Sequence, residues 1–193
     1  MANAHKGQLS SLEGKIAIVT GGTQGLGEAT AHLFADRGLK GAVICGRNAG
    51  NGEKVKAALE KKGVKTVFVK ADLAKVEDSR AVVAAADKAF GRADVLVNVA
   101  GMTDRGTIWD TSPELFDTMF AINVRAPFFL MQDTAKLMKR EKTEGTMINI
   151  ISMSGHGGQT FITAYCASKG ALITLTKNVA FSLMRHRIRV NGL

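Results

Sequence analysis

Cysteine and proline are both scarce in this chain, with two of each among 193 residues. Cys45 and Cys166 show neither a CxxC motif nor a Cys/His ligand spacing, so we expect two reduced thiols and no metal site. No continuous apolar run is long enough to span a bilayer, which argues against a membrane protein. Residues 1–11 are polar and lack the apolar core of a signal peptide, so we expect a short flexible tail and a cytoplasmic protein.

Acidic residues are fewer than basic ones, 17 against 26, which gives a net charge of +9 at pH 7. The densest basic cluster, RHRIR at residues 185–189, falls at the end of an expected helix, where cations complement the helix dipole. No zinc-finger or RNA-recognition signature accompanies it. We therefore expect no nucleic-acid partner, although charge alone leaves a nucleic-acid binder as an alternative.

Short apolar stretches alternate with stretches of helical spacing along the rest of the chain. The expected strands cover 15–20, 41–46, 65–70, 93–98 and 145–152, and a sixth begins at 188. The expected helices cover 25–38, a stretch ending near 62, 76–90, 112–140 with a kink at Pro127, and 163–187. Continuous apolar strands that alternate with helices indicate an α/β fold with a parallel sheet covered on both faces. The sequence predicts a single domain over residues 12–193.

A glycine-rich loop, TGGTQGLG at 20–27, lies between the first expected strand and the first helix. Gly21, Gly25 and Gly27 would allow a tight turn and let a pyrophosphate approach the backbone at a helix N-terminus. The spacing alone is weak evidence, but its position at the first strand-to-helix turn strengthens it. The loop therefore predicts a dinucleotide site, to which Thr23, Gln24 and Leu26 also belong.

The end of the second strand, ICGRN at 44–48, bears on which dinucleotide would bind. An acidic residue there would favour NAD by holding the adenosine ribose hydroxyls. Arg47 stands there instead, beside Asn48, and a guanidinium suits a phosphate. We expect NADP(H) to be favoured, with NAD(H) as the alternative.

Tyr165 is the only tyrosine in the chain, and Lys169 follows it by four residues, on the same helix face. An ammonium about 4 Å from a phenol favours the phenolate by about 4 kcal/mol at an effective dielectric near 20, which suits general acid–base catalysis. A half-buried tyrosine beside a surface lysine is the alternative. Ser152, Asp72 and Asn98 are each expected at or just after a strand end, so these polar residues converge on one edge of the sheet.

Several motifs in the same order and spacing resemble the short-chain dehydrogenase/reductase (SDR) family over residues 12–193. They are TGGTQGLG (20–27), ADL (71–73), DVLVNVAG (94–101), INV (122–124), INIIS (148–152), YCASK (165–169) and RVNGL (189–193). The resemblance implies an NAD(P)-dependent oxidoreductase with a Rossmann-type doubly wound sheet. It also implies a homotetramer or homodimer, formed through helices 112–140 and 163–187.

The resemblance assigns roles to individual residues. Tyr165 would be the general acid or base, Ser152 would hold the substrate oxygen, and Lys169 would assist the phenol and bind the nicotinamide ribose. Asn123 would hold a water that relays protons to Lys169. Ser154 is the alternative to Ser152. The cofactor contacts implied beyond the glycine loop, Arg47 and Asn48 are Asp72, Leu73, Asn98, Ala100, Gly101, Tyr165 and Lys169.

Three departures from the family pattern stand out. Val99 replaces an asparagine that is mostly structural, and Gln24 stands where NADP users often have a basic residue. The family also continues past the RVN motif with a substrate-covering segment. We therefore expect that the C-terminal part of the fold is missing from this chain.

The substrate is the least determined part of the prediction. The candidate pocket residues are Met102, Thr103, Trp109, Met153, His156, Gln159 and Phe161. This set suits a small, moderately apolar ketone or alcohol, or a sugar-like substrate held by Gln159 and His156. A 3-oxoacyl-carrier-protein reductase and a non-catalytic nucleotide-binding protein remain alternatives.

Overall fold

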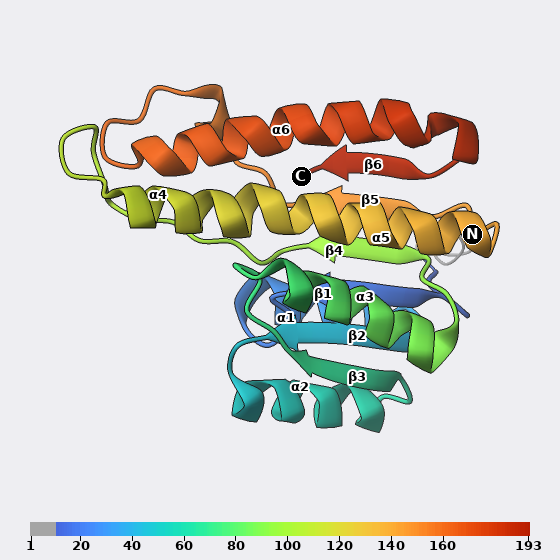
Figure 1. Ribbon diagram of the computed structural model, residues 1–193. Coiled ribbons are helices and arrows are strands. Elements are labelled where there is room, and N and C mark those ends of the chain that lie inside the picture. Colours follow the sequence, from blue (N-terminus) through green and yellow to red (C-terminus); the bar gives the residue numbers. More distant parts are fainter. Residues whose placement is uncertain (1–10) are drawn as a thin grey trace, which may run out of the picture.

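The computed structural model describes residues 11–193, so the predicted flexible tail lies almost entirely outside the described residues. Six parallel strands form one sheet in the order β3-β2-β1-β4-β5-β6 (Figure 1). This order confirms the predicted Rossmann-type, doubly wound sheet. The strands are β1 (Ile16–Thr20), β2 (Gly41–Gly46), β3 (Lys65–Lys70), β4 (Val95–Asn98), β5 (Thr146–Asn149) and β6 (Arg189–Gly192).

Helices cover both faces of the sheet. They are α1 (Gly25–Asp36), α2 (Ala49–Lys61), α3 (Val76–Phe90), α4 (Pro113–Phe120), α5 (Ala126–Arg140) and α6 (Thr163–Leu183). Alternate residues of β1 divide between two cores: Ile18 packs in the core formed with α3, α5 and α6, whereas Ala17 and Val19 pack in the core formed with α1 and α2. The strands are continuously apolar because both of their faces are buried.

The long helix predicted over 112–140 is interrupted by a π-helical turn at Ala121–Arg125, between α4 and α5. Pro127 lacks an N–H, so it cannot donate to the carbonyl of Asn123 four residues earlier. The helix widens there, and the Ala126 N–H donates to the Ala121 carbonyl five residues back. The kink predicted from Pro127 is thus a π turn centred on Asn123.

Two elements end three or more residues earlier than predicted. β5 ends at Asn149, so Ser152 lies three residues beyond the strand and not at its end. Ser152 instead precedes a short 3-10 helix at Met153–His156. α6 ends at Leu183, and a 3-10 turn leads from there to Arg187, whose φ of 56° breaks the helix.

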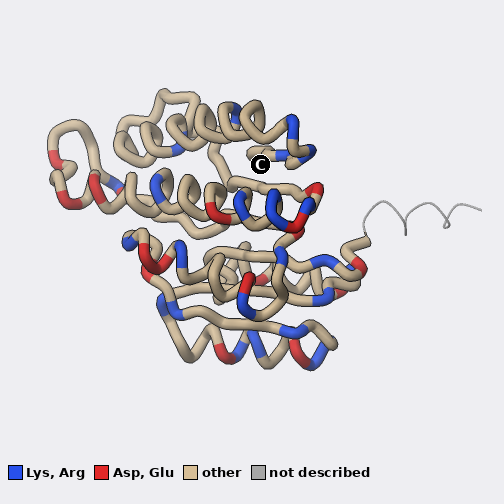
Figure 2. Tube along the Cα trace, turned by 45° about the vertical axis from the view of Figure 1, so that its right-hand side comes forward, with Lys and Arg blue, Asp and Glu red and all other residues tan. Residues whose placement is uncertain are grey.

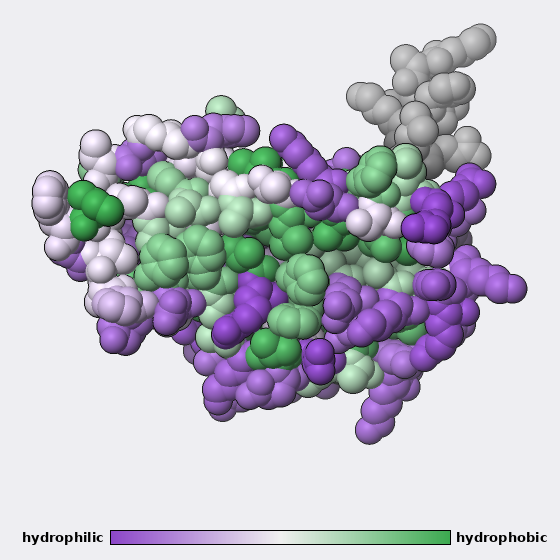
Figure 3. Space-filling model, turned by 45° about the horizontal axis from the view of Figure 1, so that its top comes forward, coloured by the Kyte–Doolittle hydropathy of each residue, from purple (hydrophilic) through white to green (hydrophobic). Residues whose placement is uncertain are grey.

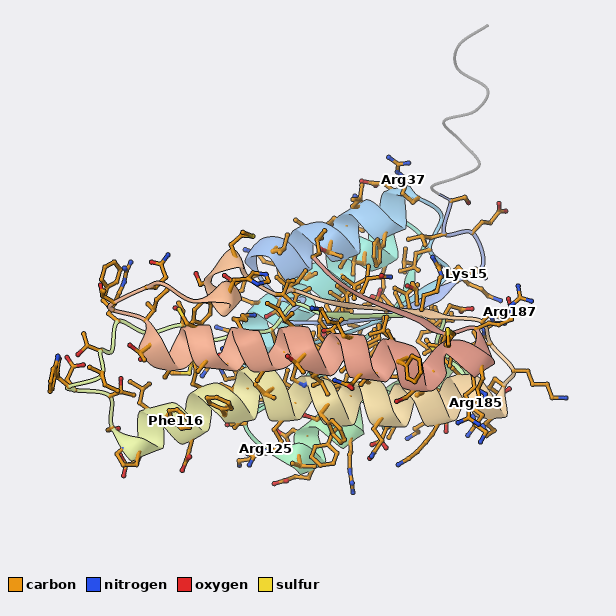
Figure 4. The ribbon with its side chains drawn as sticks, turned by 90° about the horizontal axis from the view of Figure 1, so that it is seen from above. Lys15, Arg37, Phe116, Arg125, Arg185 and Arg187 are labelled. Atoms are coloured by element: carbon orange, nitrogen blue, oxygen red, sulfur yellow. The ribbon has the colours of Figure 1, made fainter. Side chains whose placement is uncertain are left out.

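The basic segment 185–189 lies at the C-terminal end of α6, far from the first turn of that helix (Figure 4). Arg187 Nε pairs with Glu144 Oε1 at 3.1 Å. Elsewhere along the trace, Lys and Arg are interspersed with Asp and Glu (Figure 2). The cations of residues 185–189 thus lie at the negative, C-terminal end of the α6 dipole, as predicted for a basic helix end.

The carboxyl ends of the parallel strands meet at one edge of the sheet, where the loops after β1, β4 and β5 gather (left in Figure 1). β1 and β4 are neighbours, although they are far apart in the chain. The strand order reverses between them, which makes this the switch point at which open α/β sheets bind ligands.

Candidate active site

A cleft of about 720 Å³ opens at this switch point, at the carboxyl ends of β1, β2, β3 and β4. Most of the residues predicted to bind a cofactor line it, although they come from four separate parts of the chain. They are Gly21, Thr23, Gln24, Gly25, Leu26, Gly27, Arg47, Asn48, Asp72, Leu73, Ala100 and Gly101. The candidate substrate residues Met102 and Thr103 line the same cleft, together with Ile122 of the π turn.

The glycine loop has the geometry of a phosphate cradle. Gly21 and Gly25 adopt positive φ angles of 64° and 54°, and a Cβ on Gly27 would overlap the carbonyl oxygen of Gly21. No side chain caps the N-terminus of α1, because Gln24 at the N-cap position makes no capping hydrogen bond. The first amides of α1 are therefore available to an anion, and the loop fits the pyrophosphate of a dinucleotide.

The end of β2 contributes Arg47 and Asn48 to the cleft. The Arg47 side chain is exposed, so it can reach a ligand phosphate. Asn48 also caps α2, because its Oδ1 accepts a hydrogen bond of 3.0 Å from the Asn51 N–H. Cys45 is buried beside them, and burial raises the pKa of its thiol to about 12, so we expect it to be unreactive.

The turn after β4 is held by a residue that the sequence analysis missed. Thr20, the last residue of β1, accepts hydrogen bonds of 3.1 Å from the N–H groups of both Val99 and Ala100. The sequence does carry a signal for this role, because Thr20 is a polar residue at the end of an otherwise apolar strand. Asn98 was predicted to contact the cofactor, but it does not line the cleft. Its side chain is buried and donates to Asn149 Oδ1 at 2.8 Å.

Tyr165 and Lys169 lie on the first turns of α6, as predicted. Lys169 is only 5% exposed, its Nζ donates to the Ile150 carbonyl at 2.6 Å, and it lies 5.8 Å from the centre of the Tyr165 ring. Burial lowers the pKa of the Lys169 ammonium, whereas the hydrogen bond to Ile150 favours its charged form. This lysine is therefore no surface cation: it is a desolvated group held beside the phenol.

Gly101 brings this pair together with the turn after β4. A Cβ on Gly101 would lie 3.7 Å from Lys169 Nζ and 3.5 Å from Asn123 Oδ1. The absence of a side chain leaves space between the cleft and the buried ammonium. Gly101 lines the cleft, whereas Tyr165 and Lys169 do not, so the cleft ends next to the tyrosine–lysine pair.

The side chain of Asn123 is almost fully buried and ties three parts of the site together. Its Oδ1 accepts from the Met102 N–H at 2.8 Å, and its Nδ2 donates to the Met102 carbonyl at 2.8 Å and to Ser168 Oγ at 3.0 Å. Ser168 in turn donates to the Tyr165 carbonyl at 2.7 Å. The π turn thus fixes the loop after β4 against the helix that carries Tyr165.

Ser152 lies in the loop before α6 and is half-buried. Its Oγ accepts a hydrogen bond of 3.2 Å from the Ser154 N–H, which leaves its own proton free to be donated. The 3-10 helix that follows packs against α6, because a Cβ on Gly155 would lie 2.9 Å from the backbone of Lys169 and Gly170. Ser152 is therefore presented on the same side as the start of α6.

The predicted substrate residues are more exposed than a closed pocket would require. Met153 is 84% exposed and Trp109 is 91% exposed, and neither lines the cofactor cleft. His156 and Gln159 are also exposed. Phe161 is also exposed, at 48%, but the Arg105 guanidinium lies 5.9 Å from its ring centre, which joins the loop after β4 to the loop after β5.

Two kinds of feature are absent from residues 11–193. None of the helices there is both long and apolar enough to cross a membrane. Within the same residues, no three His, Cys, Asp or Glu side chains come together in a way that could hold a metal ion.

Comparison with known proteins identifies the family. The model of the short chain dehydrogenase family matches residues 15–193. Galactitol 2-dehydrogenase from Agrobacterium fabrum is 34% identical over 182 residues, which cover 94% of this chain and 70% of that protein.

Two solved structures extend this result to the fold. NAD⁺-bound xylitol dehydrogenase has a TM-score of 0.88 at 31% identity, with 94% of this chain and 69% of that chain covered. L-sorbose reductase from Gluconobacter frateurii, complexed with NADPH and L-sorbose, has a TM-score of 0.90 at 30% identity, with 95% and 69% covered. With its glycine cradle and its buried lysine beside a tyrosine, the chain belongs to the short-chain dehydrogenase/reductase family, whose members are NAD(P)-dependent oxidoreductases of CH–OH and C=O groups.

Proposed function

We propose that the chain interconverts a secondary alcohol and a ketone of a polyol or sugar with NADP(H), and that Tyr165 is the general acid and base. The single observation that carries the mechanism is the buried Lys169 ammonium beside the Tyr165 ring at the end of the cofactor cleft. The relatives that act on galactitol, xylitol and sorbose support the substrate class.

The proposed roles of the residues are those implied by the family resemblance, and their positions are compatible with them. A nicotinamide cofactor bound in the cleft would supply or accept the hydride. In the reducing direction, the Tyr165 phenol gives its proton to the carbonyl oxygen as the carbonyl carbon is reduced to CH–OH, and Ser152 donates a hydrogen bond to the same oxygen. The Lys169 ammonium stabilises the phenolate that remains.

The phenolate must regain a proton from solvent before the next turnover. Lys169 is almost fully buried, so a water is needed to connect it to solvent. The Asn123 carbonyl suits this purpose, because Pro127 has no N–H to occupy it. The Asn123 side chain is already engaged by Met102 and Ser168, so its backbone would hold the relay water.

The preference for NADP(H) rests on Arg47. It is the exposed cation at the end of β2, and the stretch 44–48 contains no acid that would repel a 2′-phosphate. The structural relatives do not decide this point, since one is bound to NAD⁺ and the other to NADPH.

Replacing Arg47 by aspartate should reverse the preference. We expect the ratio of kcat/KM with NADPH to that with NADH to fall by about 100-fold, because a charge-assisted contact is lost and a repulsion is added. Steady-state kinetics with both cofactors measure this ratio. The matched control is Lys54→Asp, which replaces an exposed cation on α2. Arg92→Asp is unsuitable as a control, because Arg92 pairs with the buried Asp94. An unchanged ratio in Arg47→Asp would contradict the assignment.

We infer in addition that a second copy of the chain covers the face formed by α4, α5 and α6. Apolar side chains gather across this face (Figure 3), and Phe116, Phe128 and Phe181 are 43%, 40% and 77% exposed. A groove of about 670 Å³ runs along it, lined by Phe120, Val124, Phe128 and Leu175, with Arg125 at its side. An exposed apolar surface of this kind is typical of an interface.

Light scattering should therefore give the mass of a dimer or tetramer. Phe128→Glu should shift the protein toward the monomer, because it places a charge in the apolar groove. Leu33→Glu is the matched control, since Leu33 is 52% exposed on α1, on the opposite face of the sheet. A monomer in the wild type, or equal masses for wild type and Phe128→Glu, would count against this interface.

The experiment that tests the proposed function is a cofactor-consumption screen with NADPH and NADH against ketoses, simple ketones and acyl thioesters. We expect consumption of NADPH with at least one ketose. Cofactor binding without consumption of any substrate would instead indicate a non-catalytic nucleotide-binding protein. Consumption with acyl thioesters alone would indicate a carrier-protein reductase.

A further inference from the structure

The π turn between α4 and α5 reaches the cofactor cleft and also holds two segments that flank it. Ile122 of this turn lines the cleft itself. Asn123 holds the loop after β4 through the N–H and the carbonyl of Met102. The exposed side chain of Arg125 makes a further contact, in which Nη2 donates to the Ala74 carbonyl at 2.7 Å, across 51 residues of sequence. The turn is therefore tied to the loop after β3 as well as to the loop after β4.

The loop after β3 forms one end of the cofactor cleft. Asp72 and Leu73, directly before Ala74, line the cleft there, together with Arg47 at the end of β2. The glycine loop after β1 lies between this end and the end next to Tyr165. With the pyrophosphate at the glycine loop, the adenosine half of a dinucleotide would lie at β2 and β3, and the nicotinamide half would point toward Tyr165.

Other hydrogen bonds hold the loop after β3 from its own side of the cleft. The Asp72 N–H donates to Asp78 Oδ2 of α3 at 2.7 Å, and the Ala74 N–H donates to Asp72 Oδ1 at 3.1 Å. These two bonds shape the turn and join it to α3, but they do not connect it to the nicotinamide side. Arg125 provides that connection, because α5 lies between α3 and α6 in the same helical layer (Figure 1).

We propose that Arg125 is a positioning residue for the cofactor, which holds the adenosine-side wall of the cleft in place through the Ala74 carbonyl. This rests on the proposed function. Asn123 and Arg125 are two residues apart, which is about half a helical turn, so their side chains leave the turn on nearly opposite sides. Asn123 is accordingly buried, whereas Arg125 is exposed on the outer side (Figure 4). Arg125 does not line the cleft, so it acts on the cofactor only through the loop.

The test measures cofactor binding and turnover separately. Arg125→Met keeps an unbranched side chain and removes the donor. We expect the Kd of NADPH to rise by about 5- to 10-fold, because a charge-assisted hydrogen bond that orders the loop is lost. The Kd of adenosine 2′,5′-bisphosphate, which contains the adenosine half alone, should rise by a similar factor. At saturating NADPH, kcat for reduction of a ketose should stay within about twofold, because Asn123 still holds the nicotinamide end.

Three variants serve as controls. Arg125→Lys retains a cationic donor, so its Kd should return to within about twofold of the wild type. Arg80→Met is the matched arginine: Arg80 on α3 is exposed and pairs with Asp133 of α5 at 3.7 Å, so it also bridges α3 and α5, but away from the cleft. Phe128→Glu perturbs the neighbouring groove and leaves Arg125 intact. We expect a wild-type Kd for both of these variants.

Several results would overturn the assignment. An unchanged Kd in the folded Arg125→Met protein, even with a lower melting temperature, would mean that the contact is merely structural. A fall in kcat at an unchanged Kd would place Arg125 at the reacting end. Equal rises in Kd for Arg80→Met or Phe128→Glu would show that helix packing or the interface controls binding.

The binding measurements also separate this inference from the proposed function. Wild-type protein that binds NADPH but reduces no ketone and oxidises no alcohol overturns the proposed function, while the Kd comparison still decides the role of Arg125. Wild-type protein that binds neither NADPH nor NADH overturns both.

Discussion

Replacing Tyr165 by phenylalanine is expected to lower kcat by about 100- to 10,000-fold while leaving the Kd of NADPH unchanged. The substitution removes only the phenolic hydroxyl, which is the group proposed to exchange a proton with the substrate oxygen. The cofactor cleft is lined by other segments, chiefly the glycine loop and the ends of β2 and β4. Single-turnover oxidation of bound NADPH, together with fluorescence titration of the cofactor, would separate the two effects.

Cys166→Ser is the matched control for this variant. Cys166 is the next residue on the same helix and has a thiol that the mechanism does not use. We expect its kcat to stay within about twofold of the wild type. If Tyr165→Phe retained wild-type turnover, another group would have to supply the proton, and the assignment of Tyr165 would be wrong.

Replacing Gly27 by alanine should abolish cofactor binding and lower the free energy of unfolding by about 1–3 kcal/mol. The added Cβ would overlap the Gly21 carbonyl, which is backbone and cannot swing aside like a flexible side chain. The glycine loop must open to relieve this overlap, and the first amides of α1 then lose their position around the pyrophosphate. Chemical denaturation and NADPH titration measure the two consequences.

Gly50→Ala is the control for the general effect of glycine replacement. Gly50 is an exposed residue in the first turn of α2, and a Cβ there would have only ordinary contact, 3.4 Å from Asn48 Oδ1. Alanine favours the helix over glycine by about 1 kcal/mol, so this variant should be as stable as the wild type or more stable. Tight NADPH binding by Gly27→Ala would contradict the role given to the loop.

The regular elements could be predicted from the sequence because they follow local patterns. β2 and β3 have the predicted limits, as does α3, since each is bounded by glycine or by a change from apolar to charged residues. The π turn could be anticipated only as a kink. Pro127 signals the missing N–H, but whether the helix bends or widens depends on what holds Asn123 from outside the helix.

The candidate site could be predicted where a residue's role depends on its position at a strand end or on a helix face. Gly21, Arg47 and Asp72 line the cleft for this reason. The substrate side could not be predicted in the same way, because Trp109 lies in a loop and Met153 in a short 3-10 helix, and the direction of both segments depends on tertiary contacts. The role of Thr20 also emerged only in three dimensions, from hydrogen bonds made to a distant segment.

The central claim is that a nicotinamide bound at the switch point exchanges a hydride with a substrate carbon held beside Tyr165. Reduction of a ketose with NADPH that carries deuterium at both hydrogen positions of the nicotinamide C4, followed by NMR of the product, tests this most directly. The account predicts deuterium on the new carbinol carbon with the wild type, and about 100-fold less labelled alcohol in the same time with Tyr165→Phe. Product with no deuterium on that carbon, or equal labelling by both proteins, would contradict it.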